Sequence, residues 1–498
     1  MNQLANPLDI PEILSRVGMY IPLWVYPDQN STRNRRPRFT PQHLLNCILV
    51  SRTWYNILLP ILWFTFDDIS IPSVFRSEQN LIRHGRHLRI LELSRPIPAV
   101  PLKLLPHNLL HLDLSRFSNN ARAKDLVLQN TRLQSLHWQG GDFHRDDYGT
   151  LDAKALSKRL RRLQDLHLEC WKLDKGFMNL LRRNPGLRRL ALEYVTGEIY
   201  QTRALDNHCD QEAANDDSNN DDKAEDGDEE EEEEEEEEQG GEIQLSYLST
   251  LTVCKDVGSG TLEELVRLCP RLEELSWTGS TDSDLRQLTK NLRDCCPGLS
   301  ALTYSTVEIN EDESAYATLI QSIPRLVELL IRIPTLGDRF TDALVKHAPT
   351  LEILDLKIEN HHGLSHANLK RILTSCHQIT ALSIEGSRWG ADLFSFDWAC
   401  LRLSRLLLQG LYSMTRGQVA EADNASVATI YGWTATASET EAGMERTATD
   451  TIRPYGETAL MHKVSAGFFK KLLLHLQAMV HLQSFVLNGV EYTRQPFV

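Results

Sequence analysis

A leucine phrase with fixed internal spacing returns at nearly constant intervals along the chain. Four successive copies begin at Leu272, Leu299, Leu326 and Leu351, and each reads L-x-x-L-x-apolar. The intervals between them are 27, 27 and 25 residues. Self-similarity at a period of this size indicates one structural unit repeated along the chain. No other feature of the sequence limits the fold as strongly.

Each unit is predicted to contain one helix and one strand. The alternation x-L-x-L places the leucines on one face of a short strand. The residues before each strand, for example 261–268 and 340–347, have apolar side chains at helical spacing and are followed by proline. Ordering about 25 residues costs roughly 1–2 kcal/mol per residue in backbone entropy, which the few apolar side chains of one unit cannot offset. The units must therefore stack.

Nine further copies of the phrase extend the array in both directions. They begin at Leu88, Leu109, Leu133, Leu163, Leu187, Leu248, Ile379, Leu403 and Leu482. The pattern is that of a leucine-rich repeat, so we predict an α/β fold with a leucine-rich-repeat solenoid, or horseshoe, over residues 88–498. A linking helix is expected within residues 67–87, at 75–87.

Two insertions interrupt the predicted array. Residues 206–242 contain 21 acidic residues and one lysine, and removing this net charge of −20 from the chain's −15 leaves +5. With almost no apolar residue, this tract is expected to be disordered, either as a solvated spacer or as a segment that recruits basic proteins. Residues 412–458, rich in alanine, threonine and serine, have no period and are expected to form a second disordered insertion.

Cysteine usage and hydropathy favour a soluble chain in a reducing compartment. The nine cysteines contain no C-x-x-C pair, and no apolar run approaches the length of a membrane span. Residues 1–9 lack the pattern of a secretory signal. We expect a cytoplasmic or nuclear protein that binds no membrane. Because the part outside the acidic tract is only mildly basic, nucleic acid is not expected as a partner.

The first 66 residues are predicted to form three short helices around a polar insertion, 22–40. Asp9 and Glu12 resemble a capping box, and Ile10, Ile13, Leu14 and Val17 make an apolar stripe. Two more helices are expected to start near Thr40 and Ser51. A module this small cannot bury all of its large apolar side chains, so part of its surface should remain for a partner.

Three motifs in this segment resemble an F-box: L-x-x-P-E-I-L at 8–14, L-V-S-R-T-W at 49–54 and L-W at 62–63. With the repeats behind it, the chain resembles the F-box/leucine-rich-repeat receptors of SCF ubiquitin ligases. The resemblance implies docking on the Skp-family adaptor of a cullin complex. The matching contact positions are Leu8, Pro11, Ile13, Leu14, Val50 and Trp54. The alternative is that the same residues only shield the open end of the solenoid.

The exposed positions of the strands are expected to line the concave face, the usual binding side of such arrays. The candidates for substrate contact are Glu92, Asp113, His137, His167, Arg189, Glu274, Leu330 and Asp355. Together they form a polar surface with isolated apolar positions, suited to a protein substrate whose identity the sequence does not specify.

The sequence contains no pattern that predicts catalysis or a cofactor. His137 and His167 with Asp113 could in principle form a metal site, but ordinary polar contacts explain them better, so neither metal nor cofactor is expected. The arginines of 33–38 are either a solvated loop or a nuclear-import patch. We therefore predict a non-enzymatic substrate receptor of an SCF-type ligase. The alternative is a leucine-rich-repeat scaffold that binds basic proteins through its acidic tract.

Overall fold

The computed structural model describes most of the chain outside the two insertions. The described residues are 10–25, 38–69, 71, 76, 78–94, 107–115, 120–141, 148–174, 176–197, 244–254, 259–279, 282–306, 313–359, 365–386, 396–409, 428, 433–437, 466–487 and 490–494. The acidic tract, 206–242, lies outside the described residues, as do most of 412–458 and the arginines of 33–37.

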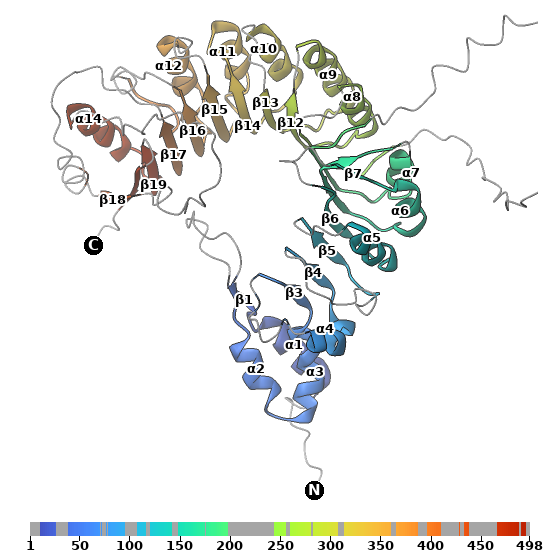
Figure 1. Cartoon of the computed structure of the whole chain (residues 1–498). Helices are drawn as coiled ribbons and strands as arrows, with labels where there is room; N and C mark the ends of the chain where they lie inside the picture. The colour runs from blue at the N-terminus through green and yellow to red at the C-terminus, as the bar shows by residue number, and fades with distance from the viewer. Residues whose placement is uncertain are drawn as a thin grey trace, which may run out of the picture.

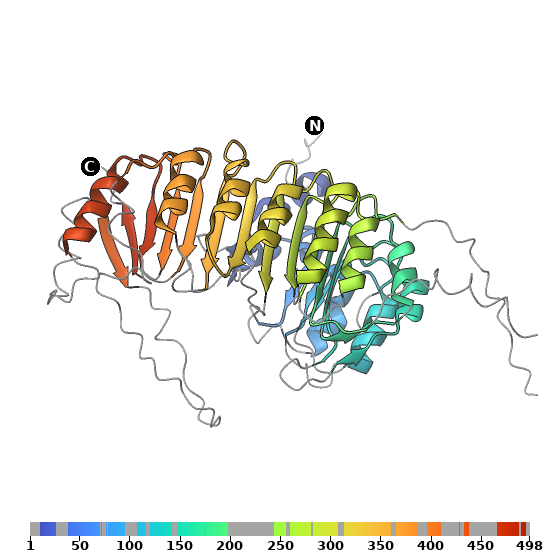
Figure 2. The same cartoon turned by 90° about the horizontal axis from the view of Figure 1, so that it is seen from above.

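A curved sheet runs through the described part of the repeats, and it lines the inner side of an arc (Figures 1 and 2). Sixteen strands form it, in the order β18-β20-β19-β17-β16-β15-β14-β13-β12-β11-β10-β8-β6-β5-β4-β3. The first nine by sequence are β3 (Thr65–Asp67), β4 (Ile90–Glu92), β5 (His111–Leu114), β6 (Ser135–Gln139), β8 (Asp165–Glu169), β10 (Arg189–Glu193), β11 (Thr250–Val253), β12 (Glu274–Gly279) and β13 (Ala301–Thr306). The others are β14 (Glu328–Ile333), β15 (Ile353–Ile358), β16 (Ala381–Glu385), β17 (Arg405–Gln409), β18 (Trp433–Ala437), β19 (Ser484–Leu487) and β20 (Val490–Arg494).

Helices cover the outer side of the arc (Figure 1). They are α4 (Glu78–His84), α5 (Asn120–Gln129), α6 (Ala153–Arg159), α7 (Gly176–Arg182), α8 (Ser259–Leu268), α9 (Asp282–Cys295), α10 (Glu313–Ser322), α11 (Asp338–Val345), α12 (His366–Ser375) and α14 (Ala466–Gln477). A 3-10 helix, η3 (Gly85–His87), continues α4. The predicted helices at 75–87, 261–268 and 340–347 therefore correspond to α4 with η3, to α8 and to α11.

The thirteen strands predicted from the leucine phrase all occur, as β4 to β6, β8, β10 to β17 and β19, and neighbours pair in parallel. Register aligns equivalent leucines, so that Leu275 lies opposite Leu302 and Leu302 opposite Leu329. These three side chains are at most 1% exposed, whereas the residues between them face the concave side. The chain is therefore an α/β solenoid of leucine-rich repeats, built on the predicted period.

Buried asparagines tie the ends of some helices to the neighbouring repeat. Asn184, 1% exposed, accepts a hydrogen bond from the Leu163 amide at 2.9 Å and donates to the carbonyl oxygens of Leu160 and Leu180 at 2.9 and 2.8 Å. Asn130 accepts from the Leu109 amide at 3.0 Å in the same way. Each bond gives a partner to a buried backbone N–H or C=O group that has none within the helices and strands.

Both ends of the sheet differ from the sequence prediction. β3 adds a strand before the first leucine phrase, and its Phe66 packs in the core beside Leu91. At the other end, β20 pairs antiparallel with β19, and β18 pairs antiparallel with β20. β18 lies inside 412–458, so the prediction that this whole insertion lacks structure is wrong. The period could not reveal β18 or β20, because antiparallel strands at an edge do not follow the repeat.

The N-terminal segment forms three helices, α1 (Pro11–Tyr20), α2 (Gln42–Ile48) and α3 (Arg52–Leu62). Short strands β1 (Trp24–Val25) and β2 (Arg38–Phe39) pair antiparallel, so the polar insertion leaves and re-enters the module at one place. The N-cap of α1 is Ile10, without a side-chain bond, so the predicted cap at Asp9 is wrong. Ser51 caps α3 as predicted, since its Oγ accepts from the Trp54 amide at 3.2 Å.

We predict that Asn184→Ala lowers the unfolding free energy by about 1–3 kcal/mol, because it leaves the buried Leu163 amide and Leu160 carbonyl without partners. The measurement is the urea midpoint followed by circular dichroism. Asn179→Ala, an exposed change in the same helix α7, is the control and should move stability by less than about 0.5 kcal/mol. Equal effects of the two variants would contradict the role assigned to Asn184.

Candidate functional site

Helix α1 of the N-terminal module has one buried side and one exposed apolar side. Leu14 is fully buried, and a Cβ added to Gly18 would lie 2.5 Å from Leu58 Cδ2 of α3, so this side packs closely on α3. Ile13 and Val17 lie on the other side and are 39% and 42% exposed. Together with Ile10 and Tyr20, which share their helical spacing, they form an apolar stripe open to solvent.

The turn between α2 and α3 adds a second exposed apolar segment. Leu49 and Val50 are 83% and 63% exposed. Eight of the fourteen exposed large hydrophobic residues in the described part of the chain lie between positions 10 and 55. Such a concentration on a monomer is typical of an interaction surface. We call this set the module's apolar surface: Ile10, Ile13, Val17, Met19, Tyr20, Leu49, Val50 and Tyr55.

The six residues predicted to contact an adaptor fall into four groups. Pro11, Ile13 and Val50 are exposed, and Trp54 is half-buried against the core. Leu8 lies outside the described residues. Leu14 belongs to the module's own core, so its prediction as a contact residue is wrong for this structure. The apolar stripe predicted for the first helix is thus divided, with Leu14 facing α3.

Part of this surface was not predicted from the sequence. Tyr20 and Leu49 were not among the predicted contacts, although both are highly exposed. For Tyr20 the signal was available, because it continues the spacing of Ile10, Ile13 and Val17 around the helix. Leu49 stands in the motif at 49–54, but its exposure was not predictable, because exposure in a turn depends on how α2 and α3 pack.

The predicted substrate-contact residues all lie on the concave face of the sheet. Glu92, Asp113, His137 and His167 occupy equivalent positions on β4, β5, β6 and β8, and register sets each beside the next. Arg189 and Glu274 lie on the same face of β10 and β12. Leu330 and Asp355 are neighbours on β14 and β15, far along the array from the histidines.

Two histidines form a stacked pair on the N-terminal part of this face. The rings of His137 and His167 lie 3.9 Å apart between centroids and are parallel to within 3°. Carboxylates surround them. His137 Nδ1 lies 3.5 Å from Asp113 Oδ2, and His167 Nε2 lies 3.2 Å from Glu193 Oε1. Among the described residues no group of three or more His, Cys, Asp and Glu side chains is arranged to hold a metal ion.

The histidines keep the neighbouring carboxylates ionised. Burial would raise the pKa of Asp113, but the hydrogen bond and charge of His137, together with bonds from Ser115, lower it to about 2. The hydrogen bond to His167 lowers the pKa of Glu193 against the effect of burial. These groups therefore carry full negative charge near neutral pH.

Charge is distributed unevenly along the concave face. On β4 to β12 the side chains facing the concave side include six carboxylates and a single arginine. The carboxylates are Glu92, Asp113, Asp165, Glu169, Glu193 and Glu274. On β13 to β17 three carboxylates and three basic residues balance one another. Since Arg189 is paired with Asp165, at 2.8 Å from Nη2 to Oδ2, the acidic excess lies in the first part of the array.

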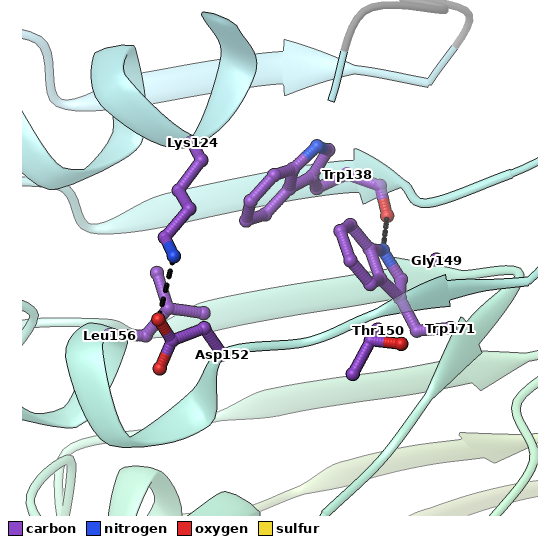
Figure 3. Close-up of a pocket in the computed structure, with 7 residues that line it drawn as sticks. All are labelled: Lys124, Trp138, Gly149, Thr150, Asp152, Leu156 and Trp171. Carbon is purple, nitrogen blue, oxygen red and sulfur yellow. Dashed lines mark hydrogen bonds and ion pairs between the residues drawn. The ribbon is translucent and has the colours of Figure 1, made fainter. Parts of the chain in front are cut away.

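A cavity of about 180 Å³ lies between helices α5 and α6 (Figure 3). Trp138 and Trp171 pack edge to face along it, with ring centroids 4.6 Å apart, and Trp171 Nε1 donates to the Trp138 carbonyl at 2.8 Å. Lys124 Nζ and Asp152 Oδ2, 2.6 Å apart, pair beside them. The extra residues of this long repeat form β7 (Gly149–Thr150) and β9 (Trp171–Lys172). The cavity therefore results from the extra length of this repeat. Its charged side chains, Lys124 and Asp152, are paired with each other and offer no reactive group.

Comparison with known proteins yields distant structural similarity only. A scan against protein-family models finds no match, and no curated protein matches the sequence. One similar structure is the TLR13–ssRNA13 complex, at 16% identity over 70% of this chain and 40% of that chain, with a TM-score of 0.35. An internalin, InlF, from Listeria monocytogenes matches at 16% identity over 58% and 78% of the two chains, with a TM-score of 0.28.

A third similar structure is the plant peptide hormone receptor RGFR1 in complex with RGF2, at 14% identity over 70% of this chain and 58% of that chain, with a TM-score of 0.28. The chain thus spans less than half of the TLR13 chain. In the described part of the chain, no helix has the length and hydropathy to cross a bilayer.

We predict that His137→Ala raises the pKa of Asp113 from about 2, because burial then acts without the imidazole. A carboxyl whose pKa is lower in the folded chain than in the unfolded chain stabilises the fold at pH values above its unfolded-state pKa. This contribution is lost as the pH falls through the folded-state pKa. The variant should therefore lose the Asp113 contribution at a higher pH than the wild type. Carbon-13 NMR of labelled aspartate measures the titration. An unchanged midpoint would contradict the assigned coupling.

Proposed function

We propose that this protein is the substrate-recognition subunit of an SCF-type ubiquitin ligase. In this role the N-terminal module docks on a Skp-family adaptor, the cullin complex supplies the ubiquitin chemistry, and the concave face of the solenoid binds a protein substrate. The chain itself performs no catalysis. It acts where the adaptor and cullin complex are present, in the cytoplasm or the nucleus.

One observation carries the proposal: the module exposes the eight residues of its apolar surface while other leucines of the same helices are fully buried. Leu14, Leu44 and Leu58 are fully buried, so the module has a core of its own. The exposed side chains of α1 and of the α2–α3 turn are then not needed for folding. Exposed apolar side chains gathered on a module that has its own core are typical of a protein interaction surface, and tyrosine is enriched in such interfaces.

Shielding the end of the solenoid does not account for this surface. The residues that join module and solenoid are Leu62, Trp63 and Phe66, and all are buried. Trp63 stacks on His84 of α4 at 4.8 Å, and the Phe64 carbonyl accepts from the Arg89 and Ile90 amides at 2.9 and 3.1 Å. The module therefore covers the first repeat with a different set of residues from the exposed ones.

We predict that Val50→Asp weakens binding to a purified Skp-family adaptor by roughly tenfold to a hundredfold, because a charge would be desolvated in the interface. Biolayer interferometry with the full chain measures the affinity. Val480→Asp is the matched control, since Val480 is 73% exposed at the other end of the array. It should bind like the wild type.

Two results would reject the proposal: no adaptor binding by the wild type, or equal binding by Val50→Asp and Val480→Asp. Ile13→Asp provides a second test on α1, where the same loss is expected. Leu14 is unsuitable for this test because a charge in the module core would unfold it.

A further inference from the structure

A small side chain follows the stacked histidines in their row on the concave face. His137 and His167 occupy the same row on β6 and β8, and register sets Ala191 of β10 next in that row. Thr252 of β11 follows. Adjacent strands are about 4.8 Å apart, so a third flat group would stack at the place where Ala191 has only a methyl group. The outer face of His167 borders this position.

Negative charge borders the same position. Glu193 lies two residues after Ala191 on the same face of β10, and one of its oxygens is 3.2 Å from His167 Nε2. A carboxylate has about four acceptor sites. The other acceptor sites of Glu193 can therefore receive further donors. Glu169 is the neighbour of Glu193 in register on β8 and adds to the negative potential.

We propose, resting on the substrate-receptor function above, that this surface recognises an arginine side chain in a basic segment of the substrate protein. The guanidinium stacks on His167 above Ala191 and donates to Glu193. The surrounding carboxylates of β4 to β12 attract the remaining positive charge of the segment. We call the position formed by His167, Ala191 and Glu193 the arginine site.

The site favours arginine over lysine for a geometric reason. A guanidinium is planar, stacks on aromatic rings and presents paired donors to a carboxylate, whereas an ammonium is a compact and strongly hydrated charge. A guanidinium can lie flat against the ring of His167 while its paired donors reach Glu193, whereas an ammonium gains neither the stacking nor the paired donation. General attraction to the acidic face would treat the two cations alike.

The negative charge on the concave side of β4 to β12 does not follow from the overall composition of the chain outside the acidic tract. Outside residues 206–242 the chain carries a net charge of +5, yet β4 to β12 place six carboxylates and one arginine on the concave side. Burial raises the pKa of Glu328 on β14, and repulsion from the nearby Glu274 of β12 raises it further. A cationic partner would relieve this repulsion.

The test uses the full chain and two fluorescent peptides that are identical except that one contains four arginines and the other four lysines. Fluorescence anisotropy at two salt concentrations measures both affinities. We expect the arginine peptide to bind about fivefold tighter, and both to weaken as salt rises. Equal affinity of the two peptides, or no binding of either, would overturn the proposal.

Ala191→Leu fills the position without changing charge, and it should reduce arginine-peptide binding to the level of the lysine peptide. Ser383→Leu is the control, because Ser383 occupies the same row on β16, away from the histidines. Glu193→Gln, which adds no bulk, should also remove the arginine preference. Equal loss in the two leucine variants, or a preference that survives both Ala191→Leu and Glu193→Gln, would overturn the arginine site.

Deletion of residues 206–242 distinguishes binding at the arginine site from binding by the acidic tract. The deletion should weaken both peptides alike and leave the preference for arginine intact. Loss of that preference would instead assign recognition of basic proteins to the tract and overturn the arginine site. Adaptor binding is measured separately on the same variants, so failure of the arginine site and failure of the ligase role give different results.

Discussion

The structure depends on the mutual burial of leucines in neighbouring repeats. Leu302 of β13 is covered on one side by Leu275 of β12 and on the other by Leu329 of β14, and all three are at most 1% exposed. No single repeat could stabilise itself, because its strand is too short and its apolar face too small. Stacking brings the residues between the leucines into rows on the concave side. Those rows contain the acidic face and the stacked histidines.

For the same reason the two terminal repeats must be covered, because each of them lacks a neighbouring repeat on one side. At the C-terminal end, β20 and β18 close the sheet with antiparallel pairing, and Tyr492 of β20 stacks on Phe485 of β19 at 4.7 Å. At the other end β3 and the three-helix module cover the first repeat. Since buried residues near Trp63 form that junction, the exposed residues of α1 and of the α2–α3 turn are left without a structural role in the described part of the chain.

Much of the fold was predictable because the period is a local property of the sequence. Thirteen strands and their common register follow from the spacing of leucines alone. β18 and β20 were not predictable, because their pairing depends on contacts outside the repeat pattern. The orientation of Leu14 was also missed, although Gly18 one turn later marks the side of α1 that approaches α3 closely. The stacking of His137 on His167 was not predictable, because the register places the two residues side by side but does not fix the orientation of their rings.

Hydrogen–deuterium exchange of the full chain with and without a purified Skp-family adaptor tests the central claim most directly. The account predicts slower exchange in α1 and in the α2–α3 turn upon adding the adaptor, with β6, β8 and β10 unchanged. Unchanged exchange in the module, or protection confined to the concave strands, would contradict it.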